Sequence, residues 1–121
     1  MLSYLDKEGS LSKDYSKTLD NDVLLKAYQT MCLCRYLDER MINLQRQGTI
    51  SFAMSAFGEE AAVVGSAVAL NMEDWIFPQY REAGSIFFRG LSIQDYIHHM
   101  FCNGKDIILG RQMPNHFGDK K

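Results

Sequence analysis

The spacing of hydrophobic residues predicts one long amphipathic helix in the first half of the chain. Leu19 is a possible hydrophobic staple, and the acidic and amide residues that follow it are possible N-caps. Apolar residues then recur every three or four positions, at Leu24, Ala27, Tyr28, Met31, Cys34, Leu37, Met41 and Leu44. Because this spacing places them on one helix face, we expect a helix that ends before Gly48.

The second predicted helix is rich in small residues. It covers residues 58–70, and Glu59 and Glu60 lie in its first turn, where carboxylates interact favourably with the helix dipole. Alanine, glycine and serine leave room for another backbone to come close, so we expect tight internal packing. In an isolated piece of a larger protein, this helix would face solvent where its partners are missing.

Two shorter helices are predicted in the second half. One begins near residues 80–82 and ends at Gly90, because glycine easily adopts the left-handed conformation that ends many helices. The other follows a capping-box pattern at residues 92–95 and runs to about residues 103–104. From Lys105 onward the chain has no period, and we expect a loop.

The remaining segments predict an arm and short extended pieces. Residues 1–22 lack an apolar period, so we expect an extended N-terminal arm there and a helical part over residues 23–121. Residues 49–53 are expected to form a loop or a strand-like piece. The apolar triplet at residues 75–77, stopped by Pro78, predicts a short buried extended segment. The piece should therefore be mostly α, with one or two short strands.

Composition excludes several classes of partner. Apolar residues make up 46% of the chain and charged residues 23%, as in ordinary globular domains. Thirteen basic and fifteen acidic residues give a net charge of −2, so we expect no nucleic-acid partner. The longest nearly apolar run, residues 61–70, is too short to span a bilayer, and we expect no membrane partner.

Cysteine and histidine residues do not form a recognisable metal site. His98, His99 and Cys102 could supply ligands, but a structural site usually needs a second ligand pair, so a structural role is favoured. Cys32 and Cys34 point to different sides of the long helix, and core packing is favoured for them. Three cysteines are too few for a disulfide scaffold, which suggests free thiols.

Most charged residues on the predicted helices have a simple structural interpretation. Arg35 lies three and four positions before Asp38 and Glu39, which predicts solvated ion pairs on the polar face. Glu59 and Glu60 could in principle be an acid and base pair, but adjacent residues on a helix diverge, so charge at a helix start is favoured.

The best candidate for chemistry is the junction at residues 79–82. An apolar segment ends there and a helix begins, so free N–H groups, the helix dipole and the guanidinium of Arg81 could bind an anion. Arg81 could equally pair with a carboxylate, and the residues alone leave both interpretations open. One arginine is not a complete cofactor site, so further groups would have to come from elsewhere. His116, in a glycine-flanked loop, could reach a ligand, although a plain loop histidine is favoured.

Several motifs, in order, resemble the alpha subunit of the branched-chain 2-oxoacid dehydrogenase, the thiamine-diphosphate-dependent first component of that multienzyme complex. The resemblance covers nearly the whole chain, and the loop before His116 differs from the Gly-Gly-Ser-Met-His type of pyruvate dehydrogenases. The matching stretches are Gln45-Arg46-Gln47-Gly48, Ile50-Ser51-Phe52, Gly58-Glu59-Glu60, Val64-Gly65-Ser66-Ala67, Gln79-Tyr80-Arg81-Glu82-Ala83-Gly84 and Gly110-Arg111-Gln112-Met113-Pro114 with His116.

The resemblance implies a site and a reaction. Gln79, Tyr80 and Arg81 would help to hold thiamine diphosphate, with Arg81 on the diphosphate, and no catalytic residue or metal ligand is assigned within the chain. The parent enzyme would decarboxylate branched-chain 2-oxoacids oxidatively and transfer the acyl group to a lipoyl group of the acyltransferase core, in branched-chain amino-acid catabolism. Magnesium, and potassium in the parent subunit, would be bound by residues outside this chain. The cofactor would lie between alpha and beta subunits of an α2β2 heterotetramer.

The resemblance also implies that residues 1–121 are the N-terminal part of a longer subunit. The parent would have an α/β thiamine-diphosphate-binding fold, and the piece alone would be inactive because its magnesium ligands are absent. Alternatives are a truncated helical module that binds the beta subunit, or a pyruvate-type alpha subunit. The expected location is the mitochondrial matrix in a eukaryote and the cytoplasm in a bacterium.

Overall fold

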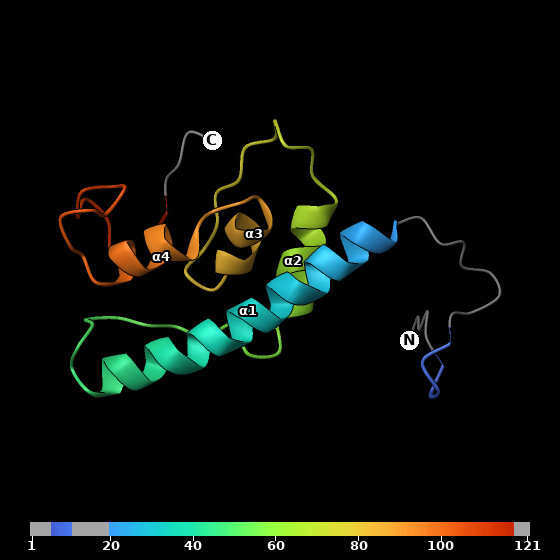
Figure 1. Ribbon diagram of the computed structural model, residues 1–121, viewed down its shortest axis with the longest axis horizontal. Helices are drawn as coiled ribbons and strands as arrows, with labels where there is room; N and C mark the ends of the chain where they lie inside the picture. The colour runs from blue at the N-terminus through green and yellow to red at the C-terminus, as the bar shows by residue number, and fades with distance from the viewer. Residues whose placement is uncertain (1–5, 11–19, 118–121) are drawn as a thin grey trace.

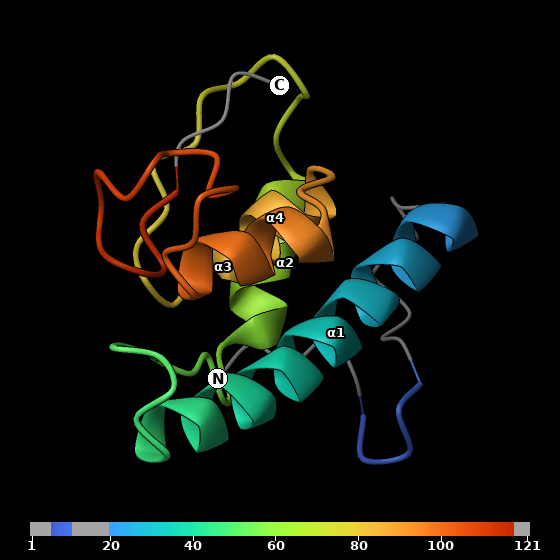
Figure 2. The same cartoon turned by 60° about the vertical axis from the view of Figure 1, so that its left-hand side comes forward.

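A computed structural model describes residues 6–10 and 20–117 of the chain. Within these residues, four helices follow one another: α1 (Asn21–Arg46), α2 (Glu60–Val68), α3 (Ala83–Phe88) and α4 (Ile93–Met100). Figures 1 and 2 show α1 running along one side of the molecule, with α3 and α4 together on the opposite side. None of the helices in these ranges is long and apolar enough to cross a membrane.

The long first helix is confirmed, with a slightly earlier start. The side chain of Asp20 caps it by accepting a hydrogen bond of 2.7 Å from the N–H of Asn21. Gly48, with φ +72°, follows its end in the left-handed conformation that glycine adopts easily. The last two residues of the arm predicted over residues 1–22 are therefore helical. Within that arm, residues 6–10 form a turn, and residues 1–5 and 11–19 lie outside the described residues.

Gly84 of α3 is the only glycine in the described residues at which an added Cβ would meet atoms within 4 Å. A Cβ atom at this position would lie 3.1 Å from both Cys34 Sγ of α1 and Val64 Cγ2 of α2, and 3.3 Å from Val63 Cγ1. Tight packing of α2 is therefore present, but the small residue at the contact belongs to α3 and α2 contributes valines. The opposite face of α2 is exposed, as expected for part of this helix, at Ala61, Ala62, Gly65 and Ser66.

The hydrophobic core lies between α1 and the pair α3 and α4. Its buried members are Cys34, Met41, Ile50, Phe87, Tyr96 and Met100. The rings of Phe87 and Tyr96 join α3 to α4, with centroids 5.0 Å apart. The core placement predicted for Cys34 is thus confirmed, and Cys32, Cys34 and Cys102 are all free thiols.

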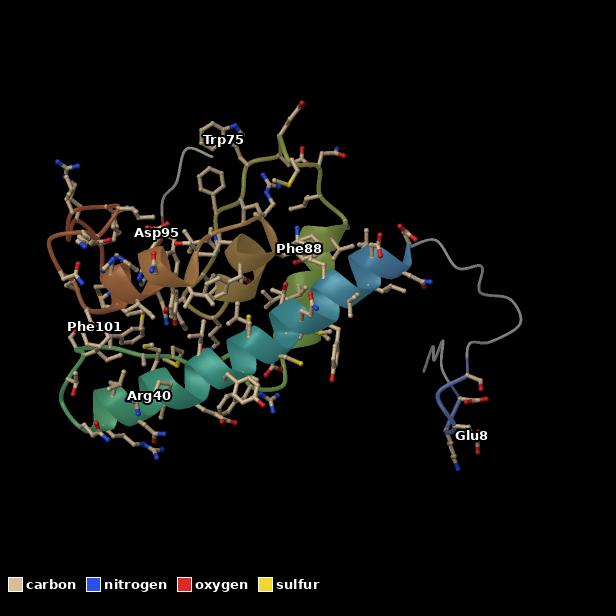
Figure 3. The ribbon with its side chains drawn as sticks, in the orientation of Figure 1. Glu8, Arg40, Trp75, Phe88, Asp95 and Phe101 are labelled. Atoms are coloured by element: carbon tan, nitrogen blue, oxygen red, sulfur yellow. The ribbon has the colours of Figure 1, made fainter. Side chains whose placement is uncertain are left out.

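The predicted buried extended segment at residues 75–77 is wrong. Trp75 and Phe77 are 84% and 85% exposed, and their rings stack on each other with centroids 6.3 Å apart. Figure 3 shows Trp75 on the outer side of the segment that joins α2 to α3. The preceding turn is held by Arg89, whose guanidinium binds three backbone carbonyls, those of Asn71, Met72 and Asp74.

The other expected strand is also absent. Residues 49–51 form a bend and residues 52–53 are irregular, and no β-strand occurs in the described ranges 6–10 and 20–117. A strand needs a neighbour to pair its N–H and C=O groups, and the described part of the chain supplies none. The mostly helical character is confirmed, and the expectation of one or two strands is corrected.

The two shorter helices differ from prediction at their boundaries. Residues 80–82 form a turn, and α3 begins only at Ala83. The capping box before α4 is confirmed, because Ser92 Oγ accepts a hydrogen bond of 3.0 Å from the Asp95 N–H. This helix ends at Met100, earlier than predicted, and Cys102 soon after it has a φ of +47° that an α-helix cannot contain.

Replacing Gly84 with alanine tests the close contact. We expect Gly84→Ala to destabilise the intact protein by about 1–3 kcal/mol, because the added methyl overpacks the junction of three helices. The matched control is Gly65→Ala in α2, where an added Cβ meets no atom within 4 Å and the change should stabilise by roughly 0.5–1 kcal/mol. Thermal unfolding of both variants measures the difference, and equal effects would refute the tight contact.

Candidate functional site

The three predicted site residues lie together in the turn that leads into α3. The turn is closed by Glu82, whose Oε2 accepts a hydrogen bond of 2.8 Å from the Gln79 N–H and whose own N–H donates to the Gln79 carbonyl at 2.9 Å. Tyr80 is partly exposed and its ring meets that of Phe52 edge to face, with centroids 6.3 Å apart. These contacts fix the positions of Tyr80 and Arg81 in the turn between α2 and α3.

Arg81 pairs with a carboxylate in this structure. Its Nη1 lies 3.2 Å from Glu59 Oε1, both side chains being about half exposed at 42% and 51%. Its Nη2 lies 3.6 Å from the thioether sulfur of Met54, a weak acceptor. Its Nε is buried and has no hydrogen-bond acceptor among the described residues. The guanidinium thus has one oxygen partner and unused N–H groups, so the two interpretations of Arg81 from the sequence are compatible.

The helix-dipole part of the predicted anion site is not supported. The helix after the junction, α3, has only six residues, and its dipole is correspondingly limited. The N–H of Gln79, one of the donors expected to be free, is already bound to Glu82. Any affinity of this junction for an anion therefore depends mainly on the Arg81 guanidinium.

The loop after α4 brings His116 to this turn. The ring of His116 lies beside that of Tyr80, with centroids 6.3 Å apart and the planes tilted by 51°. The residue before it, Asn115, lines a very small cavity together with Tyr80, Arg81 and Asp38. Three segments that are distant in sequence therefore meet here: the turn itself, the loop after α4, and α1.

The solvated ion pairs predicted for Arg35 are wrong. Arg35 pairs instead with Glu60 of α2, with Nη2 at 2.5 Å from Oε1, and Glu60 is largely buried. Asp38 is buried as well, and its Oδ2 accepts a hydrogen bond of 2.7 Å from the N–H of Ala56. Both carboxylates therefore tie the segment before α2 to α1. The predicted placement of Glu60 at the start of α2 is confirmed.

Asp38 was missed as a member of the site. Burial raises the pKa of its carboxyl to about 6, and the negative charge of Glu60 adds to this, against the hydrogen bond from Ala56 and the charge of Arg35. Such a shift is common for groups in clefts. The sequence feature that could have indicated the burial of Asp38 is its position four residues after Cys34, on the apolar face of α1.

His99 forms a buried pair with a carboxylate. Its Nδ1 lies 3.1 Å from Asp106 Oδ1, and both side chains are fully buried. Burial by itself would raise the pKa of Asp106, but the N–H groups of Gly110 and Ile108 and the His99 ring outweigh it and lower the pKa. Within the described residues, no three His, Cys, Asp or Glu side chains are grouped so that they could hold a metal ion.

A larger open groove lies on the other side of α1. Tyr28 and Tyr36 line it together with the paired side chains of Arg35 and Glu60. It contains none of the three predicted site residues. The polar groups around Arg81 that could bind a ligand are therefore separate from the polar groups that line this groove.

Comparison with known proteins identifies the family. Residues 28–121 match the family described as "Dehydrogenase E1 component". The chain belongs to the dehydrogenase E1 component family. The match includes α2, α3, α4 and the Tyr80–Arg81 turn, as well as most of α1.

Curated relatives within this family are alpha subunits of one dehydrogenase. The chain is 46% identical over 118 residues to "2-oxoisovalerate dehydrogenase subunit alpha, mitochondrial" of Dictyostelium discoideum, covering 97% of this chain and 27% of that protein. The proteins of the same name from Caenorhabditis elegans and Homo sapiens are 42% and 38% identical, over 92% and 97% of this chain, and the match covers 26% of each. The chain thus spans about a quarter of the length of these relatives.

The buried carboxyl of Asp38 in this E1 component chain predicts a pH-dependent stability. Its pKa is raised from 3.8 to about 6 on folding, so the folded state binds more protons and stability falls as pH rises through this interval. Asp38→Asn retains an acceptor oxygen for the Ala56 N–H and removes the charge. We expect the variant to be more stable than the wild type by about 1–2 kcal/mol at pH 7.5, after allowance for screening by solvent.

The difference should disappear near pH 4, where the wild-type carboxyl is protonated. Denaturant unfolding of the intact protein at both pH values measures it, and Glu73→Gln, at an exposed position, is the control for simple loss of a carboxylate. An Asp38→Asn variant that is less stable than the wild type at pH 7.5 would contradict the prediction.

Proposed function

We propose that the chain forms part of the thiamine diphosphate site of a branched-chain 2-oxoacid dehydrogenase, as the N-terminal region of its alpha subunit. Membership of the E1 component family and relatives named 2-oxoisovalerate dehydrogenase subunit alpha support this proposal. The observation that carries it is the incompletely paired guanidinium of Arg81, beside Gln79 and Tyr80 in one turn.

The contacts of Arg81 fit a diphosphate ligand. A guanidinium offers five N–H donors in a planar fork that matches phosphate oxygens. In this chain one of its nitrogens meets a carboxylate oxygen, one meets only sulfur, and Nε meets no acceptor. The pair with Glu59 is exposed, and such pairs contribute about 0–1 kcal/mol, so an anionic ligand can replace or add to it at little cost.

Other parts of the site come from outside the described residues in this proposal. When bound, thiamine diphosphate supplies the chemistry that decarboxylates a 2-oxoacid, and the protein binds and orients it. Ligands for magnesium, and for potassium in the parent subunit, belong to the rest of the alpha subunit. The beta subunit would complete the cofactor site in an α2β2 assembly, and a lipoyl group of the acyltransferase core would accept the acyl group. The names of the relatives place the protein in mitochondria if its source is eukaryotic.

Substitution of Arg81 tests the proposed role. In the intact dehydrogenase, we expect Arg81→Ala to weaken the binding of thiamine diphosphate about tenfold to a hundredfold, the effect of losing a charge-assisted hydrogen bond. Arg81→Lys should recover only part of the loss, because lysine cannot bind two oxygens with a planar fork. Calorimetric titration of the cofactor in the presence of magnesium measures the affinity.

Glu59→Gln is the matched control because it removes the observed partner of Arg81. If Arg81 binds the diphosphate, this variant should keep the cofactor affinity or raise it by up to about fivefold, since a competing charge is lost. If Arg81 serves only to pair with Glu59, the Arg81→Ala and Glu59→Gln variants should behave alike. That result would reject the proposed role of Arg81.

A further inference from the structure

The loop between α4 and residue 117 is held at both ends by buried hydrogen bonds. Near its start, Asp106 binds the His99 ring with Oδ1 and accepts from the Gly110 N–H with Oδ2 at 2.8 Å. Near its end, the hydroxyl of Tyr96 donates to Asn115 Oδ1 at 3.3 Å. Both anchoring side chains on α4, Tyr96 and His99, are fully buried. The loop is therefore fastened to α4.

The loop has a backbone conformation that local preferences do not favour. Leu109 and Asn115 have φ angles of +56° and +66°, in the left-handed region where residues other than glycine are uncommon. Such residues persist when surrounding contacts determine their conformation. The contacts to α4 provide that constraint, and they set the position of His116, which directly follows Asn115.

The hydrogen bond of His116 shows which ring nitrogen is available to a ligand. Its Nδ1 lies 3.2 Å from the carbonyl oxygen of Pro114. A carbonyl oxygen only accepts, so Nδ1 must carry a proton and donate it. Among the described residues, the hydrogen bond of the His116 ring is made by Nδ1, and no partner of the other nitrogen, Nε2, is found. Nε2 is therefore the atom of His116 that can meet a ligand beside Tyr80.

We propose that His116 binds an oxygen of the 2-oxoacid substrate through Nε2 and that Asp106 is the residue that positions it. This assignment depends on the proposed function. Arg81 contacts Glu59 and Met54, whereas His116 contacts Tyr80 and the carbonyl of Pro114, so the two side chains share no partner. A ring that donates from Nδ1 to Pro114 and from Nε2 to the substrate is an imidazolium, which suits a carboxylate.

Two substitutions of His116 separate the roles of its nitrogens. Asparagine places an amide near the position of Nδ1 and can keep the bond to Pro114, whereas glutamine places one near Nε2. In the intact dehydrogenase, we expect His116→Asn to lower kcat/KM for 2-oxoisovalerate about tenfold or more, mainly through KM. His116→Gln should lose less of kcat/KM than His116→Asn, because its amide lies near the position of Nε2 but carries no charge.

Cofactor binding provides a readout that is independent of turnover. Calorimetric titration should give both variants an affinity for thiamine diphosphate within about twofold of the wild type, because the diphosphate is assigned to Arg81. An unchanged kcat/KM in His116→Asn, or equal losses in both variants, would overturn the role of Nε2. If Arg81→Ala also left cofactor binding unchanged, the proposed function itself would fail, so the two failures are distinguishable.

A double-mutant cycle tests Asp106 as the positioning residue. Asp106→Asn should lower kcat/KM severalfold in the wild-type background and cause no further loss in His116→Asn, because Asp106 acts through His116. Additive losses would overturn this role. Thermal unfolding identifies any variant that does not fold, and in that case the His116 pair of variants still decides the proposal.

Discussion

The close approach of α3 to α1 and α2 at Gly84 is the constraint on which the candidate site depends. With a side chain at this position, α3 would have to move away from Cys34 and Val64, because the Cβ would come within 3.1 Å of both. The turn that carries Tyr80 and Arg81 lies immediately before α3, so any shift of this helix would move both residues. The packing of three helices and the geometry of the site are therefore set by the same contact.

Carboxylates connect the loops to this helical framework. Glu60 binds Arg35, Asp38 binds the Ala56 N–H, and Asp106 binds His99. A buried hydrogen bond to a charged group contributes about 1.5–3 kcal/mol, so these contacts hold their segments firmly. The pair between Arg81 and Glu59 differs because it is half exposed and correspondingly weak. The one ion pair at the proposed ligand site is thus also the one that a ligand can most easily displace.

The errors in the sequence-based expectations have a common physical origin. The triplet at residues 75–77 is apolar, but burial needs a partner surface, and the described residues provide none for Trp75 and Phe77. Arg35 and Asp38 have the spacing of a helix ion pair, yet Asp38 faces the core and Arg35 finds Glu60 in the next helix. The cofactor site at residues 79–82 stays a prediction, and the helix that follows it is too short for the dipole argument. In each case the local pattern was present, but contacts between distant segments decided which residues are buried and which are paired.

The sequence by itself determined the local features of this protein. The period of apolar residues, the capping box at Ser92 and the order of its motifs were sufficient to predict the approximate positions of the helices and the family. Only the tertiary structure decided that α3 packs against α1 and α2 with no room for a side chain at Gly84, that Asp38 is buried, and that the loop after α4 brings His116 to Tyr80. The reason is that periodicity and capping act over a few neighbouring residues, whereas burial and pairing depend on which distant segments meet in space.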